Sequence, residues 1–333
     1  MPAPVFSLGL DLGGTKLEAA LFDPHGTQVW RCRRPTPAGD YAATVLTLAA
    51  AVAQAREVAT GLAAGAPMTV GVATPGSQAA SGRMKNCNST CLNGMPLQAD
   101  LQAAIGQAVR LANDANCLAL SEATDGAGAG ASVVFAAILG TGAGAGIAVD
   151  GRVLTGPNGL AGEWGHNPLP WGEAADDPVY DCYCGKRGCI ESLICGPGLA
   201  RDHAGGHGGN DGYDRYDGYE GYGGYGGDGG ALDAVAIATR AAAGDPACAA
   251  TLQRHAHRLA RALAAVINLL DPDVIVLGGG LSALQHLYTD VPALWSNWVF
   301  SAGAGDAVRT RLLPAQHGDA SGVRGAAWLW RAA

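Results

Sequence analysis

Hydrophobic residues near the N-terminus alternate with glycine-rich turns, a pattern typical of strands joined by tight turns. The stretch from Val5 to Gly26, VFSLGLDLGGTKLEAALFDPHG, predicts a strand, a turn and a second strand. The stretch from Val133 to Gly151, VVFAAILGTGAGAGIAVDG, repeats this design. A short apolar strand that ends in a glycine turn follows in each half, at 70–76 and at 274–280. The repeat predicts two similar α/β halves that face each other, with the glycine turns around one cleft.

Helical patterns fill the intervals between these strands. The apolar spacing predicts helices over about 41–60, 115–123 and 248–270. The last is amphipathic, and Asp271-Pro272 marks its end because proline cannot continue a helix. The alternation of strands and helices favours an α/β protein.

Composition excludes several classes of protein. The chain has 333 residues, 48% of them hydrophobic and 15% charged, as expected of a globular protein with a large core. A net charge of −8 without any basic run argues against a nucleic-acid partner. The N-terminus has no charged n-region, so we expect a first strand there and no signal peptide. No apolar run approaches the length of a membrane span, and we expect no membrane partner.

The cysteines indicate a reducing compartment. Nine cysteines without a secretion signal favour a cytoplasmic protein, in which CxC and CxxxxC spacings indicate metal binding more than disulfides. Six of them lack companion ligands at metal spacing and are expected to be small, buried hydrophobic side chains. These six are Cys32, Cys87, Cys91, Cys117, Cys195 and Cys248.

The remaining three cysteines lie close to a histidine in the sequence. His166 is followed by Cys182, Cys184 and Cys189, and one imidazole with three thiolates is a ligand set for tetrahedral zinc. Four protein ligands leave no open position, so this zinc is expected to be structural. Glu163 precedes the set and Glu191 follows it, and two fixed carboxylates indicate a site for a polyol.

Two of the glycine turns carry the features of phosphate binding. Glycines allow a backbone to approach a charged group closely, and the backbone amides and threonine hydroxyls of such turns donate to oxygens. A single turn of this kind is more often only a tight hairpin, but two in matching positions are stronger support. Neither has the spacing of a P-loop. The residues of the two turns are Gly13, Gly14, Thr15 and Lys16, and Gly140, Thr141, Gly142 and Gly144.

Two aspartates stand next to predicted strands. Asp11 precedes the first turn, where it could hold a magnesium ion against the β- and γ-phosphates of a nucleotide. Asp114 follows the apolar strand 109–112 and opens a helix, a position from which a carboxylate can accept a proton during phosphoryl transfer. The same position also suits an ordinary helix N-cap, and spacing alone leaves both interpretations open.

These motifs together resemble the ROK family of sugar kinases and repressors, over nearly the whole chain. The stretches that carry the resemblance are Asp11-Leu12-Gly13-Gly14-Thr15-Lys16, Asn113-Asp114-Ala115-Asn116, Gly140-Thr141-Gly142, Glu163-Trp164-Gly165-His166 and the cysteine cluster with Glu191. Within the family the chain is most similar to bacterial fructokinases of the manno(fructo)kinase type. Three stretches indicate this subtype, 85–94, 166–171 and 317–328.

The resemblance implies an actin-like, ribonuclease-H-like ATPase fold and an ATP- and Mg²⁺-dependent hexose kinase. Fructose is the expected substrate, phosphorylated on its 6-hydroxyl, with mannose and glucose secondary. Glucose, N-acetylglucosamine and N-acetylmannosamine are the alternatives, and no physical argument from the residues decides among them. A non-catalytic sugar-sensing regulator is the rival class. Such repressors carry a DNA-binding segment before the core, and the first strand begins here by residue 5.

The resemblance also implies roles for individual residues. Asp114 becomes the catalytic base, and the sugar contacts fall on Asn113, Glu163, His166, Glu191 and, at the end of its strand, Gly76. Gly278 and Gly279 are expected against the adenosine end of the nucleotide, although a plain strand-to-helix turn also explains them. The family allows a homodimer, but no pattern in this sequence specifies an interface.

The expected domains are a smaller N-terminal one over 1–112, joined by a C-terminal helix over 322–333, and a larger one over 113–321. The segment 203–230 departs from the family pattern. It is rich in glycine and tyrosine, and so glycine-rich a segment is expected to form a disordered loop.

Overall fold

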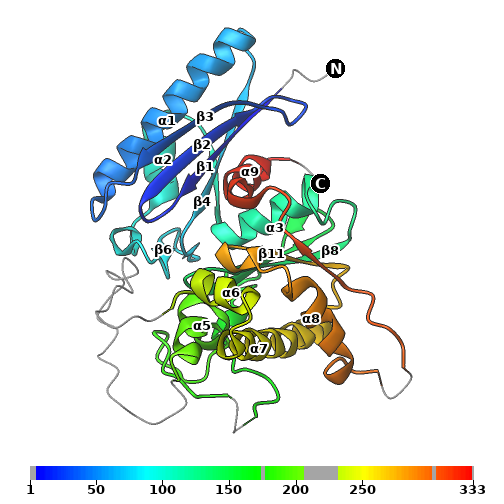
Figure 1. The fold of residues 1–333 in the computed structure, drawn as a ribbon. Helices are drawn as coiled ribbons and strands as arrows, with labels where there is room; N and C mark the ends of the chain where they lie inside the picture. The colour runs from blue at the N-terminus through cyan, green and yellow to red at the C-terminus, as the bar shows by residue number, and fades with distance from the viewer. Residues whose placement is uncertain (1–4, 174–176, 206–231, 302–304, 332–333) are drawn as a thin grey trace. The chain divides into compact units, whose positions relative to one another are not determined.

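Two five-stranded sheets frame the part of the chain that the computed structural model describes, residues 5–173, 177–205, 232–301 and 305–331 (Figure 1). In the first sheet β1 pairs antiparallel with β2 and parallel with β4, which pairs parallel with β7. Its order is β3 (Gln28–Pro35), β2 (Lys16–Phe22), β1 (Phe6–Leu12), β4 (Met68–Thr74) and β7 (Val109–Asn113).

The second sheet repeats the arrangement of the first. Its order is β10 (Arg152–Val153), β9 (Ala143–Val149), β8 (Val133–Leu139), β11 (Val274–Gly278) and β12 (Arg311–Pro314). Numbered along the chain, the strands of each sheet follow the order third, second, first, fourth, fifth. The strand repeat predicted from the sequence is thus confirmed within each sheet. A separate two-stranded ladder pairs β5 (Ser77–Gln78) with β6 (Met84–Lys85).

The chain divides into two compact units at other positions than the sequence led us to expect. Unit 1 comprises 1–130, 146–161 and 316–333, and unit 2 comprises 131–145 and 162–315. Helix α3 (Asp114–Asp125) therefore belongs with unit 1, although the expected boundary lay before it. Helix α9 (Ser321–Trp328) holds it there, since a Cβ on Gly325 would lie 1.8 Å from the carbonyl oxygen of Cys117.

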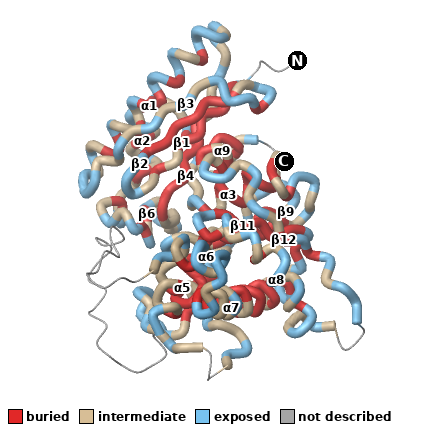
Figure 2. The backbone as a smooth tube through the Cα atoms, in the orientation of Figure 1, coloured by how far each residue is buried: buried red, intermediate tan, exposed pale blue. Residues whose placement is uncertain are grey.

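Alternation along β2 distributes its side chains to the two faces of the first sheet. Leu17, Ala19 and Leu21 join a core with helices α1 (Tyr41–Leu62) and α2 (Leu97–Ile105). Ala20 and Phe22 pack instead with Val323, Ala327 and Trp328 of α9. Both faces are covered, and Figure 2 shows β1 and β4 as largely buried.

Helix α1 is apolar because one of its sides packs into this core. Its buried residues are Thr44, Val45, Leu48, Ala51, Val52, Ala55 and Ala59. By length and composition alone it is the one helix among the described residues that could cross a membrane, a result the sequence did not lead us to expect. The buried stripe along α1 explains this composition within the fold of unit 1.

Glycines let α9 approach the first sheet at backbone distance. Gly9 of β1 and Gly71 of β4 are register partners. A Cβ on Gly9 would lie 1.8 Å from the carbonyl oxygen of Val323, and one on Gly71 would lie 1.9 Å from that of Ala326. No side chain fits at either position, so these two glycines fix the depth at which α9 packs.

The buried carboxylate of Glu122, on α3, ties the C-terminal segment to unit 1. It accepts hydrogen bonds from the backbone nitrogens of Gln316, at 3.0 Å, and His317, at 3.3 Å. The hydroxyl of Ser321 donates to it at 3.0 Å. The two backbone donors precede the 3₁₀ helix η5 (Gly318–Ala320) and Ser321 begins α9, so one carboxylate anchors the whole entry into α9.

Unit 2 is built around the long helix α7. The helix spans Pro246–Leu270, with Asp245 as N-cap, and Asp271 follows it in the left-handed conformation. Its end before Asp271 agrees with the prediction, while it begins at Pro246 and not at about residue 248. Among the described residues, the other α-helices of this unit are α4 (Glu191–Ile194), α5 (Gly196–His203), α6 (Ala234–Ala242) and α8 (Leu287–Leu294). The buried guanidinium of Arg258 pairs with Asp177, at 3.1 Å, and with Asp202, at 2.9 Å. Paired in this way, a charge is tolerated inside a core.

The predicted glycine- and tyrosine-rich loop lies mostly outside the described residues, over 206–230. Its expected first residue, His203, is the last residue of α5, and its Nδ1 lies 3.0 Å from the hydroxyl of Thr251 on α7. The predicted start at 203 is therefore wrong. Hydrogen bonding to α7 keeps His203 in regular structure.

Candidate active site

The turn between β1 and β2 has the form expected of the first phosphate turn. The backbone nitrogen of Gly13 donates to the carbonyl oxygen of Lys16 at 3.0 Å. The hydroxyl of Thr36 donates to the carbonyl oxygen of Gly13 at 2.8 Å. Gly14, Thr15 and Lys16 are exposed. The turn joins two strands, as predicted, and presents its tip to solvent.

Asp11, near the end of β1, has an unusual environment. Its pKa is raised to about 7, first by burial and then by the charges of Asp114 and Glu18, against which Lys16 acts. A Cβ on Gly322 would lie 2.6 Å from its Oδ2, so the carboxylate packs against the first turn of α9. Carboxylate oxygens are preferred ligands of Mg²⁺, and the mutual effect of Asp11 and Asp114 indicates that two carboxylates lie near each other here.

Asn113 and Asp114 stand at the start of α3, where the sequence allowed either a helix N-cap or a catalytic base. Asn113 is the N-cap of α3, because its Oδ1 accepts from the backbone nitrogen of Ala115 at 2.9 Å. Asp114 is the first residue of the helix, is exposed, and accepts from the same nitrogen at 2.8 Å. The cap interpretation thus applies to Asn113, while the Asp114 carboxylate lies at the solvent-facing start of the helix.

Gly76 is held beside Asn113, whose Nδ2 donates to the carbonyl oxygen of Gly76 at 3.2 Å. Gly76 has a φ of +77°, and a Cβ there would lie 2.4 Å from the carbonyl oxygen of Lys85. Both the backbone conformation and the lack of space require glycine. Two predicted sugar contacts, Gly76 and Asn113, are therefore neighbours in unit 1.

The turn between β8 and β9 is tied to the Glu191 side chain. The backbone nitrogen of Gly140 donates to the carbonyl oxygen of Gly142 at 3.0 Å, and Thr141 is exposed at the tip. The Oε2 of Glu191 accepts from the nitrogen of Ala143 at 2.8 Å. A Cβ on Gly142 would lie 2.6 Å from that oxygen. Gly144, predicted as part of the turn, lies inside β9.

Gly278 ends β11, and Gly279 begins the turn that follows. Gly279 has a φ of +79°, and a Cβ there would lie 2.5 Å from the carbonyl oxygen of Leu139. The 3₁₀ helix η3 (Gly280–Ala283) comes next. These two glycines thus form a strand-to-helix turn, as the structural interpretation of the sequence predicted. A turn of this kind is compatible with a nucleotide lying next to it.

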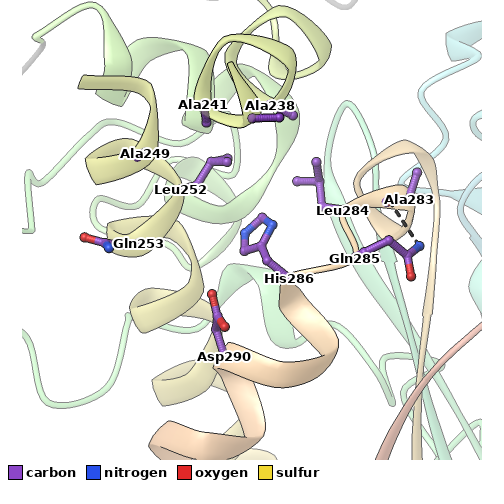
Figure 3. A pocket seen from close by; sticks show the side chains of 11 residues that line it. Ala238, Ala241, Ala249, Leu252, Gln253, Ala283, Leu284, Gln285, His286 and Asp290 are labelled. Carbon is purple, nitrogen blue, oxygen red and sulfur yellow. Dashed lines mark hydrogen bonds between the residues drawn. The ribbon is translucent and has the colours of Figure 1, made fainter. Parts of the chain in front are cut away.

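A cavity of about 460 Å³ opens just after η3 (Figure 3). Helices α6 and α7 and the segment 283–290 line it. The lining includes Ala238, Ala241, Leu252, Leu284 and His286. Burial lowers the pKa of His286, and its buried Nε2 has no hydrogen-bond partner among the described residues. The apolar walls and an unsatisfied ring nitrogen suit a flat heterocycle with polar edges.

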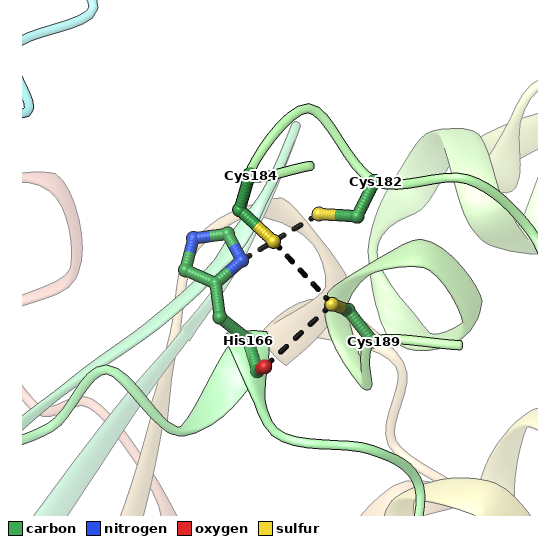
Figure 4. Close-up of side chains that lie close together, drawn as sticks. All are labelled: His166, Cys182, Cys184 and Cys189. Atoms are coloured by element: carbon green, nitrogen blue, oxygen red, sulfur yellow. Dashed lines mark hydrogen bonds between the residues drawn. The ribbon is translucent and has the colours of Figure 1, made fainter. Parts of the chain in front are cut away.

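The four predicted metal ligands meet at one point in unit 2 (Figure 4). Their donor atoms, on His166, Cys182, Cys184 and Cys189, lie within 4.8 Å of one another. The Sγ atoms of Cys184 and Cys189 are 3.6 Å apart, and Cys182 Sγ is 3.6 Å from His166 Nδ1. A tetrahedron with metal–sulfur bonds of about 2.3 Å has edges of about 3.8 Å. The donor set therefore fits a zinc ion.

Glycines allow the chain to turn between these ligands. Gly185 and Gly188 have φ angles of +83° and +71°. The backbone nitrogen of Gly185 donates to the carbonyl oxygen of Cys182 at 3.0 Å and closes the turn. These two turns let the three cysteine sulfurs converge near His166.

The predicted sugar contacts of unit 2 surround the same cluster. Glu163 is exposed and precedes the 3₁₀ helix η2 (Trp164–His166). Burial raises the pKa of Glu191 and the charge of Glu163 adds to the rise, while the Ala143 amide and His166 oppose it. The charges of Glu163 and His166 both act on the Glu191 carboxyl, so the three groups lie in one neighbourhood.

Sequence reasoning missed one residue at this place. The hydroxyl of Tyr183 lies 3.1 Å from the Nε2 of His166, the nitrogen that faces away from the cysteines. Its position between two cysteine ligands was the one available signal.

Comparison with known proteins now identifies the family. The family model described as "ROK family" matches residues 7–333. The chain belongs to the ROK family. It is 35% identical to an N-acetyl-D-glucosamine kinase of Yersinia enterocolitica, over 96% of this chain and 98% of that protein.

Solved structures of the ROK family agree with this assignment. A ROK hexokinase from Thermus thermophilus has a TM-score of 0.76 and 28% identity, with 97% of each chain covered. A ROK family glucokinase from Streptomyces griseus in complex with glucose and AMPPNP has a TM-score of 0.70 and 25% identity, with 97% of this chain and 98% of that one covered.

The predicted fold class is confirmed, since the ROK family has the actin-like ATPase fold. The prediction of a ROK sugar kinase is confirmed at that level as well. The fructokinase subtype is not supported: the Yersinia relative favours the alternative that named N-acetylglucosamine.

Proposed function

We propose that this ROK protein transfers the γ-phosphoryl group of ATP to a hydroxyl of N-acetyl-D-glucosamine, with Asp114 as the catalytic base. The observation that carries the proposal is the pair of carboxylates of Asp11 and Asp114, beside the glycine turn of unit 1. They stand at the carboxyl ends of β1 and β7, which run parallel through β4. Active groups of open α/β sheets gather at this edge.

Asp114 serves the acceptor hydroxyl in this proposal. The Asp114 carboxylate is exposed at the start of α3, where the positive end of the helix dipole attracts negative charge. It accepts the proton of the attacking hydroxyl as the new bond to phosphorus forms, and it orients that hydroxyl beforehand.

Asp11 is proposed to hold the magnesium ion of MgATP. Burial and the charge of Asp114 raise the pKa of its half-buried carboxylate to about 7, although Lys16 acts against the rise. Bound magnesium supplies positive charge against the β- and γ-phosphates. The turns at Gly13-Gly14-Thr15-Lys16 and at Gly140-Thr141-Gly142 would donate to phosphate oxygens.

The base of the nucleotide is proposed to enter the cavity that follows η3. Its volume of about 460 Å³ is within the range of small-molecule pockets. His286 Nε2 would bond a polar edge of the heterocycle, and the alanines of α6 would contact its face. Gly278 and Gly279 would then lie next to the adenosine end, as the resemblance implied.

Zinc is proposed to hold the sugar-binding residues of unit 2 in place. His166 would ligate it together with Cys182, Cys184 and Cys189, so the metal has no open position and takes no part in the reaction. Glu163, His166 and Glu191 would contact sugar hydroxyls, since carboxylates accept strong hydrogen bonds from them. The similarity to the Yersinia enzyme supports the 2-acetamido sugar.

A coupled ADP-release assay with a panel of sugars tests the proposal. The panel holds N-acetylglucosamine, N-acetylgalactosamine, N-acetylmannosamine, glucose, mannose and fructose, with a control that lacks sugar. We expect the highest kcat/KM for N-acetylglucosamine and little ADP release without sugar. A higher value for fructose would restore the fructokinase prediction. No sugar-dependent ADP release would favour the non-catalytic regulator.

A further inference from the structure

Glu18 is a buried carboxylate directly beside Asp11. The two residues are register partners in the antiparallel pair of β1 and β2, and the Glu18 side chain is only 3% exposed. Partners in such a pair have Cβ atoms about 5 Å apart on the same face of the sheet, and like charges placed there are destabilising. Unit 1 therefore holds two neighbouring carboxylates on one face of its sheet, at a cost in stability.

The next positions of β2 on this face are apolar. Ala20 and Phe22 pack with residues of α9, and Glu18 precedes them in the same alternation, on the side of the glycine turn. An apolar side chain at position 18 would avoid the repulsion with Asp11. A charge at a place that suits an apolar side chain indicates a functional constraint.

Two arginines of the edge strand β3 hold Glu18 from the side opposite to Asp11. Arg33 is the register partner of Glu18 on β3, and its Nε donates to Glu18 Oε2 at 2.8 Å. Arg31 forms an ion pair with Glu18 Oε1. Both arginine side chains are partly exposed, so water screens their charges. The two guanidinium groups thus fix the carboxylate of Glu18 on the β3 side.

The charge of Glu18 nevertheless acts on Asp11. Burial contributes most to the raised pKa of Asp11, the charge of Asp114 comes second and the charge of Glu18 third, while Lys16 opposes them. A negative charge that disfavours a bare carboxylate favours a cation bound to that carboxylate, because the same potential acts on both.

We propose that Glu18 strengthens the binding of magnesium at Asp11 by its fixed negative charge, while Arg31 and Arg33 keep its carboxylate from becoming a ligand itself. This inference rests on the proposed function, in which Asp11 holds the magnesium of MgATP. Glu18 is a positioning residue, since it acts through Asp11. A purely structural ion pair would be equally sensitive to the loss of either partner, whereas this role gives the two partners opposite effects.

Nucleotide affinity measured with and without magnesium tests the proposal. Calorimetry gives the Kd of AMPPNP in EDTA and in MgCl₂, and the ratio of the first value to the second reports how far magnesium strengthens binding. We expect this ratio to fall about tenfold in Glu18→Gln and to rise about threefold in Arg33→Gln, because the potential at Asp11 shifts in opposite directions. Glu57→Gln, on the exposed side of α1, and Arg34→Gln, on the other face of β3, should keep the wild-type ratio.

Three results would overturn the proposal. The first is a wild-type ratio in Glu18→Gln, and the second is an equal fall in Glu18→Gln and Arg33→Gln, which would make the ion pair purely structural. The third is wild-type nucleotide binding that does not respond to magnesium. The Arg33 side chain is half exposed, so Arg33→Gln decides alone if Glu18→Gln does not fold, and a ratio that does not rise there would also refute the proposal. The ratio needs no turnover, so it stays measurable if the sugar panel shows that the protein is no kinase.

Discussion

The carboxylate of Glu191 accepts a hydrogen bond from the backbone nitrogen of Ala143 at 2.8 Å. Glu191 comes directly after the cysteine cluster and begins α4, while Ala143 begins β9 directly after the second glycine turn. One bond thus connects the proposed zinc site with a proposed phosphate turn. A substitution in the turn should therefore alter the position of Glu191, and loss of the zinc site should alter the turn.

Gly142→Ala should disturb this connection. The new Cβ would lie 2.6 Å from Glu191 Oε2 and would displace the carboxylate from Ala143. We expect the KM for the sugar to rise about tenfold, in line with the loss of a charge-assisted hydrogen bond. Steady-state kinetics measure this. The control is Gly172→Ala, where a Cβ meets nothing within 4 Å; equal kinetics for both variants would refute the connection.

Cys184→Ala should release zinc and weaken sugar binding far more than ATP binding. The cluster lies beside three proposed sugar contacts, whereas its link to the proposed phosphate turn is the single bond from Ala143 to Glu191. Loss of a direct ligand should cost at least as much as loss of an outer-shell partner, so we expect the sugar dissociation constant to rise at least about tenfold. Calorimetry with each ligand and a zinc assay check this. Cys32→Ala, on the edge strand β3, should change neither quantity. An equal loss of ATP affinity would contradict the assigned role of zinc.

His255 should make the fold less stable in mild acid. Burial lowers its pKa from 6.5 to about 4, and its Nε2 lies 2.9 Å from the carbonyl oxygen of Ile194. The unfolded chain binds the proton more readily than the folded chain does. The stability that comes from keeping His255 neutral is therefore fully present above pH 6.5 and is lost as the pH falls toward 4. Between pH 7 and pH 5 the loss is about 2 kcal/mol.

Urea denaturation of the wild type and of His255→Gln at both pH values measures this effect. The wild type should lose more free energy of unfolding between pH 7 and pH 5 than the variant does. The difference of the two losses isolates His255 from other titrating groups. Equal losses would mean that the imidazole is not held neutral.

Ala241→Leu should narrow the cavity beside η3 and hinder the nucleotide. Ala241 lines the cavity, and a larger side chain would take the space proposed for the base. We expect the KM for ATP to rise about tenfold while the sugar KM stays within about twofold. A mismatch of about one methylene group in a pocket has an effect of this size. Val235→Leu, on the exposed side of α6, is the matched control. An unchanged ATP KM would place the base elsewhere.

The sequence predicted the features that depend on neighbouring residues. Alternating apolar residues and glycines predicted the paired strands around Gly13 and Gly140, because strand and turn preferences depend on neighbouring residues. The metal cluster was predictable because the spacing of Cys182, Cys184 and Cys189 brings three sulfurs together.

Features that depend on contacts between distant residues were not predictable. The cap at Asn113 rather than Asp114 depends on the backbone angles at the end of β7. The division into units depends on the backbone contact of Gly325 with Cys117, which no local pattern reveals. The bond from Ala143 to Glu191 joins residues 48 positions apart. Tyr183 was missed because a tyrosine between two ligands has no signature of its own.

The most direct test of the account compares the wild type with Asp114→Asn on the sugar that the panel shows to be preferred. The amide keeps the shape of the side chain, and its oxygen can still accept from the Ala115 nitrogen, but it is too weak a base to take the proton. Calorimetry should give a sugar dissociation constant within about threefold of the wild type, while kcat falls about 10²- to 10⁴-fold. Turnover near the wild-type rate would contradict Asp114 as the base and, with it, the proposed mechanism.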